Sequence, residues 1–444
     1  MQEVIILKPI SLFYVILFTA LVAFSPVQAQ QTLSLNEAVQ IALEHNQAIR
    51  ISQEDYRKAE AQITESRAGT FPFLTMNGTF SYDIKQPLNG FPVGDSVFAF
   101  GSGEKDNYVL NATLVQKLFD PSVFIAPQAA KIFAKLSGEN VNVVRQQTIW
   151  QTKTAYFGVL LAEAFAEVKQ QELEQIQATL ERIKMYRETG RAADFDVLRA
   201  QVEVANVRPQ LIQAQNGVEL AKAQLRNVLN LPPDRDISLS DTLAFIEMNL
   251  TFDAALAMAK AHRPDLKALQ YQIEGYHKYL RSQQYDRIPT LTGMLQYQAV
   301  YDHYQLDGDD WNPTLQGIIS VDFPYVPFLD GGLSRGRINQ AKANYRKAQL
   351  QYEQALNGVI LEVKQAVLNL NEAAQRVEAS QLNIERAQEA LKISELRYAN
   401  GLVTQLEVRD ARLALTAART NYIQALHDHN VARVTLEKVI GMID

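Results

Sequence analysis

The sequence repeats itself over almost its whole length. Residues 33–45 (LSLNEAVQIALEH) recur as residues 250–262 (LTFDAALAMAKAH), 217 positions later. A period this long excludes a solenoid of short repeats. The chain is therefore predicted to consist of two similar halves, at 30–230 and 250–444, joined by a linker at 231–249.

The first 29 residues have the plan of a secretory signal peptide. An apolar run between residues 10 and 24 follows Lys8, and the small-x-small sequence Val27-Gln28-Ala29 follows the run. We therefore expect cleavage after Ala29 and export of the mature chain. The alternative is a retained membrane anchor, for which the run is short, because a spanning helix needs about 20 residues.

Each half contains two segments in which apolar and polar residues alternate, the period-2 pattern of β-strands. The segments are about 71–84 and 107–118 in the first half, and about 288–302 and 312–324 in the second. A transmembrane β-strand has about 9–11 residues with this alternation, so the lengths favour strands that cross a membrane. The alternative is two soluble hairpins packed on helices. About eight strands are the fewest that close a barrel, so membrane-spanning strands would require several chains to share one.

A very long helix is predicted after the strands of each half. The first begins at Pro121, behind Asp120 as N-cap, and continues to about Glu188, and the second extends from about 333 to 399. In the second, apolar and small residues recur in steps of three and four from residue 338 to residue 398, the pattern of a coiled coil. A helix also precedes the strands of each half. In the first half it opens with the capping box Ser34-Leu35-Asn36-Glu37 and is expected to continue to just before the strands.

A tight turn and another helix follow each long helix. Gly190 and Gly401, 211 positions apart, are expected to end the long helices as left-handed C-terminal caps. The two tips are placed at 189–193 and 400–404, about 100 Å from the strands at a rise of about 1.5 Å per residue. Thr404-Gln405-Leu406-Glu407 has the spacing of a second capping box. Each half is thus predicted to end in a helical hairpin.

Composition argues against several other functions. The chain carries 43 basic and 49 acidic side chains, a net charge of -6, whereas a nucleic-acid-binding protein needs a basic face. It has no cysteine and six histidines, which excludes disulfides and thiolate chemistry and leaves little material for a catalytic centre. No catalytic residue, metal site or cofactor is predicted. A weak cation site in the acidic loop Asp307–Asp310 remains an alternative to a solvated loop.

The repeated layout resembles the TolC-like outer membrane efflux protein family. The resemblance rests on the two matching openings and on the tip sequence Tyr398-x-x-Gly401-x5-Glu407-Val408-Arg409-Asp410-Ala411, and it covers essentially the whole mature chain. It implies a homotrimer in which four strands per chain form one twelve-stranded barrel in the outer membrane. The helices would continue as a hollow α-barrel across the periplasm. It also implies a passive exit duct for efflux or type I secretion that docks with a periplasmic adaptor and an inner-membrane transporter. One branch of the family carries a lipid on a cysteine, and this chain, without cysteine, resembles the other branch.

The resemblance further implies where the duct closes. Tyr398, Glu407 and Asp410 match a tyrosine and two acidic gate positions of the family by their spacing from the second tip glycine, and Asp196 matches the acidic position of the first half. The alternatives are a capping role alone for Glu407 and a core position for Tyr398. A ring of carboxylates in a narrow mouth would raise the local concentration of cations.

Two features of the tips complete this set of expectations. The family's basic residue two positions after the second tip glycine is here Val403, so Arg191 and Arg409 are the alternatives for a closing ion pair. By analogy with the family, the residues expected to meet the adaptor are Gly190, Arg191, Ala192, Ala193, Gly401, Leu402, Val403 and Thr404.

Two other functions would account for parts of the sequence. A periplasmic coiled-coil adaptor or scaffold without a barrel would explain the signal peptide and the helices, but it needs neither four amphipathic strands nor a duplication. A secreted enzyme would need converging polar groups, which the sequence does not show. We therefore predict a duplicated α+β membrane protein with a coiled-coil α-barrel and a shared transmembrane β-barrel. It is expected to reside in the outer membrane, contact outer membrane lipid and extend into the periplasm, to act as a channel rather than an enzyme, and to bind no nucleic acid.

Overall fold

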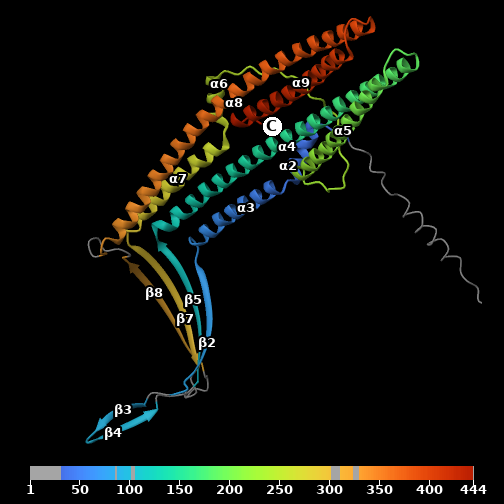
Figure 1. Ribbon diagram of the computed structural model, residues 1–444. Coiled ribbons are helices and arrows are strands. Elements are labelled where there is room, and N and C mark those ends of the chain that lie inside the picture. The colour runs from blue at the N-terminus through green and yellow to red at the C-terminus, as the bar shows by residue number, and fades with distance from the viewer. Residues whose placement is uncertain (1–31, 86–87, 102–105, 302–310, 324–329, 444) are drawn as a thin grey trace, which may run out of the picture.

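The two halves form corresponding series of helices and strands in the computed structural model, which describes residues 32–85, 88–101, 106–301, 311–323 and 330–443. The signal peptide predicted at 1–29 and the acidic loop at 307–310 lie outside these residues. The helices form one elongated bundle, with the long strands at one end and the tips of two helical hairpins at the other (Figure 1). In chain order the elements are β1 (Thr32–Leu33), α2 (Leu35–His45), α3 (Gln47–Ala68), β2 (Phe73–Tyr82), β3 (Leu88–Val93), β4 (Ser96–Gly101), β5 (Asp106–Phe119), α4 (Pro121–Glu188), α5 (Asp194–Val228), β6 (Ser238–Leu239), α6 (Phe252–His262), α7 (Pro264–Tyr285), β7 (Thr290–Tyr301), β8 (Trp311–Asp322), α8 (Leu333–Ala399) and α9 (Gln405–Val439).

The helix expected before the strands is in fact two helices. Ser34 and Glu37 form the predicted capping box at the start of α2. The chain then leaves the helical conformation at Asn46, whose side chain accepts from the Ala48 amide at 2.9 Å and so caps α3. The second half breaks at the corresponding residue, Arg263, before a proline at the first position of α7. The sequence prediction of one continuous helix was wrong because the 3.6-residue periodicity continues through the break, while a single Asn cap redirects the backbone.

The long helices α4 and α8 contain 68 and 67 residues. Asp120 caps α4 by accepting the Ser122 amide at 2.9 Å, as predicted. Most of the predicted coiled-coil positions of α8 from Ile338 to Ser380 are buried, Tyr345, Tyr352 and Leu356 are half-buried, and Tyr398 at the end of the helix is exposed. Within the described residues, no helix combines the length and the apolar character needed to cross a membrane.

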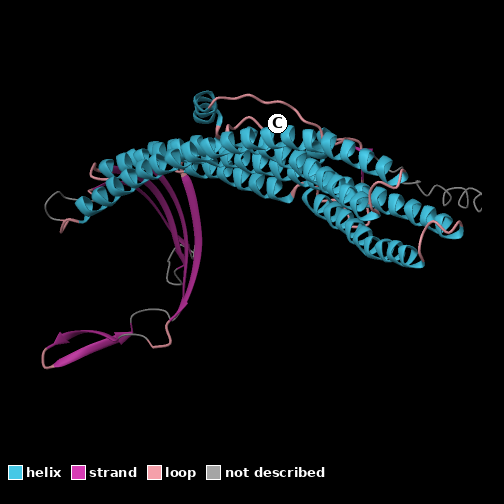
Figure 2. Ribbon diagram, turned by 45° about the horizontal axis from the view of Figure 1, so that its top comes forward, coloured by secondary structure: helices cyan, strands magenta, loops and turns pink. Residues whose placement is uncertain are grey.

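The four long strands form one antiparallel sheet in the order β2-β5-β7-β8. The central pairing of β5 with β7 joins the two halves, while β2 and β8 are the outer strands. Figure 2 shows the sheet curving away from the end of the helical bundle. At the end of the sheet far from the helices, four aromatic rings lie side by side across all four strands, with centroid distances of 4.9, 5.8 and 5.4 Å. In strand order these rings are Phe80, Tyr108, Tyr301 and Trp311.

The connection between β2 and β5 contains a hairpin. Between Lys85 and Asn107, β3 and β4 pair in antiparallel register. Phe91 and Phe98 face each other across the pair, with their ring centroids 6.1 Å apart. Two short strands with glycine and proline carry too little alternation to be recognised from sequence, so the register of this hairpin was not predictable.

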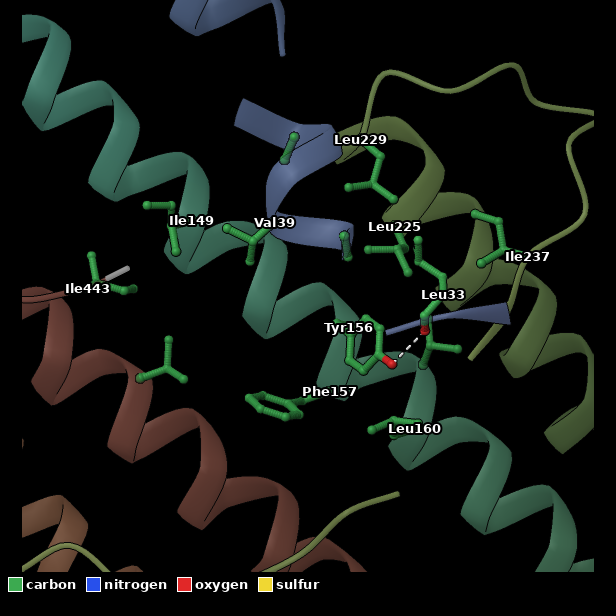
Figure 3. Close-up of a cluster of buried hydrophobic side chains, with 14 residues drawn as sticks. Leu33, Val39, Ile149, Tyr156, Phe157, Leu160, Leu225, Leu229, Ile237 and Ile443 are labelled. Atoms are coloured by element: carbon green, nitrogen blue, oxygen red, sulfur yellow. Dashed lines mark hydrogen bonds between the residues drawn. The ribbon is translucent and has the colours of Figure 1, made fainter. Parts of the chain in front are cut away.

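The largest buried cluster lies midway along the bundle, where β1, α2, α4 and α5 meet (Figure 3). Tyr156 of α4 is fully buried there, and its hydroxyl lies 2.8 Å from both the Leu33 carbonyl oxygen and an Asp241 carboxylate oxygen. Leu225 of α5 and Ile443 near the C-terminus pack into the same cluster. This cluster fixes the short helix α2 and the linker strand against the long helix.

The two halves close corresponding junctions with different residues. Asn230, just after α5, has a left-handed backbone (φ 53°), and its side chain donates to the His45 carbonyl at 3.2 Å. Its counterpart after α9 is Gly441, with φ 78°. A Cβ at Gly441 would lie 2.8 Å from the backbone nitrogen of Arg263, so only glycine allows this close approach. The duplication is therefore kept in the backbone and not in the side chains.

Candidate functional site

The tips of the two helical hairpins have the backbone geometry that the glycines predicted. Gly190 and Gly401 have left-handed φ angles of 72° and 71°. The Arg191 amide donates to the Tyr186 carbonyl at 2.7 Å, and the Leu402 amide donates to the Arg397 carbonyl at 2.9 Å. These hydrogen bonds satisfy carbonyls at the ends of the long helices, as in a glycine-terminated C-cap. Both tips therefore turn the chain tightly enough for the following helix to pack back on the long one.

The second capping box predicted at the tips is wrong. Thr404 makes no side-chain hydrogen bond to the first turn of α9, and the Glu407 amide bonds the Thr404 carbonyl instead at 3.1 Å. In the first half, Asp196 does cap, because its Oδ2 accepts the Ala193 amide at 3.1 Å. The Glu407 side chain is exposed and is not engaged as a cap.

Asp196 and Tyr398 lie close enough to interact across the two hairpins. Burial raises the pKa of the Tyr398 phenol, and the negative charge of Asp196 raises it further. The structure thus brings together one predicted gate residue from α5 and one from α8. The other two, Glu407 and Asp410, are exposed on α9, where Asp410 pairs with Arg409 at 3.4 Å.

A set of charged residues that the sequence did not single out lies beside them. Arg409 of α9 reaches Glu203 of α5, with 3.9 Å between nitrogen and oxygen, and so connects the two hairpins. Arg412, one turn further along α9, is buried and lies 3.8 Å from Glu395 of α8. Burial lowers the pKa of the Arg412 guanidinium.

These groups line a cavity of about 100 Å³ between all four tip helices, here called the inter-hairpin cavity. Its walls are formed by Thr179, Arg182, Ile183, Tyr186, Glu203, Glu395, Tyr398, Ala399, Gln405, Val408, Arg409 and Arg412. Most of these residues were missed because they occupy ordinary surface positions of long helices, with no local motif. A comparison of the two halves could have identified two of them. Arg409 and Arg412 correspond to the uncharged Leu198 and Gln201 of the first half, so their charges depart from the repeat.

The remaining sequence candidates give no second site. Within the ranges that the structure describes, no three His, Asp or Glu side chains are grouped in a way that could hold a metal ion. The tip residues Arg191 and Leu402 are exposed, and so is Gly401, while Ala192 and Val403 are partly buried. The predicted gate residues and the ion pairs beside them therefore make the hairpin tips the candidate site.

Comparisons with known proteins agree with this geometry. The family model described as outer membrane efflux protein matches residues 38–231 and 255–442, one segment in each half. The chain is 23% identical to the outer membrane protein TolC of Escherichia coli over 93% of this chain and 83% of that protein. It is 20% identical to the alkaline protease secretion protein AprF of Pseudomonas aeruginosa, over 76% of this chain and 70% of that protein.

Solved structures share the fold. The outer membrane protein VceC of Vibrio cholerae aligns with a TM-score of 0.73 at 19% identity, covering 92% of this chain and 96% of that one. The outer-membrane channel OprN aligns with a TM-score of 0.74, covering 92% of this chain and 89% of that one. Family members of this kind are channel proteins rather than enzymes. The chain belongs to the outer membrane efflux protein family and is an outer membrane channel for efflux or secretion.

Proposed function

We propose that three copies of this chain assemble into one exit duct. Strands β2, β5, β7 and β8 of each copy would form a shared twelve-stranded barrel in the outer membrane, and the helices would continue it through the periplasm. The hairpin tips would form the closable end, which docks with a periplasmic adaptor and an inner-membrane transporter. The observation that carries the proposal is that the chain has unpaired edges on both sides, strands β2 and β8 in the sheet and helices α5 and α8 in the bundle.

The first support is the open sheet. Four strands cannot close on themselves, and in lipid the free edges of β2 and β8 would leave backbone groups without hydrogen bonds. Pairing β8 of one copy with β2 of the next removes both edges. The aromatic row that includes Tyr108 and Trp311 supports a membrane position, because aromatic rings are enriched where a membrane meets water.

The second support is the order of the helices toward the tips. The main contacts follow the sequence α5–α4–α9–α8, so α5 and α8 are the outer members. Both carry exposed apolar stripes on the side that faces away from their partners in the chain. These are Phe195, Leu198, Val202, Ile212 and Leu220 on α5, and Leu350, Leu361, Leu368, Leu382 and Ile393 on α8. Exposed apolar side chains that recur along one face of an outer helix are expected where a further helix covers that face.

The third support comes from the duplication. Counting back from the tip glycines, Leu361 and Leu368 of α8 correspond to Trp150 and Phe157 of α4. Trp150 donates to Thr435 of α9 at 3.0 Å, and Phe157 is only 6% exposed. The two leucines are 66% and 58% exposed. Because α5 is the repeat counterpart of α9, we infer that α5 of the next copy covers the leucines as α9 covers their counterparts.

The gate is assigned to the tips for chemical reasons. Arg409 with Glu203 connects the two hairpins of one copy, so the hairpins cannot separate without breaking this pair. Asp196 and Tyr398 lie near each other across the same junction. Arg409 is proposed as the basic residue of the closing ion pair, because Val403 carries no charge. In the trimer, Glu407 and Asp410 would form rings of carboxylates that attract cations to the mouth. The exposed tips Gly190–Ala193 and Gly401–Thr404 are proposed as the contact with the adaptor.

The assembly is tested by the mass of the detergent-extracted protein from the outer membrane fraction, measured by light scattering. We expect about three chains per particle. The double variant Leu361→Asp, Leu368→Asp should yield monomers, because it places charges in the proposed interface. The control Leu402→Asp changes an equally exposed leucine at the tip and should leave the trimer intact. A periplasmic wild-type monomer would replace the duct by a coiled-coil adaptor or scaffold.

The gate is tested by ion selectivity in planar bilayers. Neutralising Glu407→Gln and Asp410→Asn together should reduce the preference for cations, because both carboxylates are placed at the mouth. The control is Glu378→Gln, an exposed carboxylate in the middle of α8. Unchanged selectivity in the double variant would remove these two residues from the conduction path.

A further inference from the structure

The inter-hairpin cavity contains more cationic donors than the protein satisfies. Each guanidinium has five N–H donors and no acceptor. Arg412 is buried, yet the closest carboxylate oxygen, on Glu395, is 3.8 Å away, too far for a hydrogen bond. The Nε of Arg409 is buried and has no hydrogen-bond partner among the described residues. Arg182 donates to the Thr179 hydroxyl at 3.4 Å, a long contact.

The charge of the cavity is also unbalanced. Three arginines line it, whereas its acidic lining residues are the two glutamates Glu203 and Glu395. Asp410 pairs with Arg409 from the exposed side of α9, outside the lining. Burial raises the pKa of Tyr398 above its ordinary value, so this phenol adds no negative charge to the cavity. Arg182 is exposed, but Arg412 is buried with its nearest carboxylate beyond hydrogen-bond distance, which is unfavourable unless an anion accompanies it.

The size of the cavity limits what can fill it. A volume of about 100 Å³ corresponds to roughly three water molecules at about 30 Å³ each. This is room for one halide or one tetrahedral oxyanion. Guanidinium groups from different directions suit such an anion, because they donate several charge-assisted hydrogen bonds at once.

We propose that the inter-hairpin cavity binds one small inorganic anion, held by Arg182, Arg409 and Arg412. The three arginines come from both hairpins, Arg182 from α4 and the other two from α9. An anion between them therefore ties the hairpins of one copy together. Binding follows from the cavity alone, and only its effect on opening depends on the proposed duct.

Binding is measured by calorimetry on the full-length protein in detergent at constant ionic strength. Sodium chloride, sulfate and phosphate are the three probes, and sodium gluconate, whose anion is too large for the cavity, is the background salt. We expect one site per chain for at least one probe. The comparison among the three probes identifies which anion the cavity prefers. Hydrogen exchange at residues 179–186 and 395–412 should slow when that anion is added.

Variants with opposite expected effects separate binding from misfolding. Arg409→Gln should weaken the affinity at least tenfold, because it removes a donor and a charge. Glu203→Gln should strengthen it several-fold, because it removes a competing carboxylate, and a misfolded protein would not bind more tightly. The matched control Arg191→Gln, an exposed tip arginine outside the cavity, should leave the affinity unchanged.

Two results would overturn the proposal. The first is the absence of a heat signal and of slowed exchange with all three anions. The second is equal affinity in wild type, Arg409→Gln and Glu203→Gln, which would place the ion elsewhere. Neither result bears on the duct, because the trimer mass and the bilayer conductance are measured without these anions.

Discussion

Glu203→Gln should open the proposed gate, and the size of this effect can be worked out from the structure. Glu203 of α5 lies 3.9 Å from Arg409 of α9, and this pair connects the two hairpins of one chain. Gln keeps the shape of the side chain and removes the charge. It also leaves the arginines of the inter-hairpin cavity with less compensation, so the closed arrangement loses attraction and gains repulsion.

The magnitude follows from the exposure of the pair. Two unit charges about 4 Å apart interact by about 4 kcal/mol at an effective dielectric constant of 20. The side chains of Arg409 and Glu203 are 37% and 23% exposed, so solvent screening and side-chain entropy reduce the pair to about 1 kcal/mol. If the three copies open together, the loss is about 3 kcal/mol, which shifts the ratio of open to closed channels on the order of 100-fold.

The assay is the open fraction of single channels in planar bilayers in potassium gluconate, where no small inorganic anion occupies the inter-hairpin cavity. The matched control is Arg187→Gln. Arg187 pairs with Asp194 at 2.5 Å, but both belong to the first hairpin, so this pair need not break when the hairpins separate. An unchanged open fraction for Glu203→Gln, or an equal rise for the control, would refute the reasoning.

Three further predictions concern stability. Gly441→Ala should lower the free energy of unfolding by about 2–4 kcal/mol, because it adds backbone strain and steric overlap. Gly401→Ala, at φ 71° with open space around the residue, should lower it by about 1–2 kcal/mol. The two variants are compared by their apparent melting temperatures, and equal losses would contradict the close approach at Gly441. Tyr156→Phe should cost about 1–3 kcal/mol in denaturant titrations, because the buried Leu33 carbonyl and the Asp241 carboxylate share one hydroxyl donor that Phe lacks. Burial lowers the pKa of His429 below its ordinary value of 6.5, so on acidification the unfolded chain takes up this proton at a higher pH than the folded chain. The stability that the neutral, buried His429 contributes is therefore complete above about pH 6.5 and is lost as the pH falls below it. His429→Gln should therefore flatten the pH dependence of melting between about pH 7 and 5, and an unchanged dependence would contradict this assignment.

The predictable elements are those that depend on local sequence patterns. The left-handed caps at Gly190 and Gly401 and the N-cap at Asp120 each depend on a few neighbouring residues, and the structure confirms them. The buried positions of α8 follow from a repeat of three and four that is sustained over many turns. Propensity and periodicity act over such short distances, so one sequence is sufficient to detect them.

The failures have a common cause. The break at Asn46 and the missing cap at Thr404 both depend on whether one side chain turns toward the backbone, which the residue type alone does not decide. The inter-hairpin cavity depends on how two hairpins pack, so Glu203 and Arg409, more than 200 positions apart, could not be paired from sequence. Long-range packing, and not local preference, places these groups.

The duplication suggests which parts of the duct move together. In the proposed ring, the tip hairpins meet in two kinds of junction, one within each chain and one between chains. The within-chain junction contains Arg182, Arg409 and Glu203, and their repeat counterparts, which would face the neighbouring copy, are Ile393, Leu198 and Ala414. Arg412 and Glu395 correspond to Gln201 and Lys184, so ion-paired junctions would alternate with junctions that lack these pairs and contain the exposed Leu198 and Ile393. An ion pair can exchange its partner for water, while separating apolar surfaces exposes them, so we expect opening at the ion-paired junctions. Each moving unit would then consist of two hairpins from neighbouring chains.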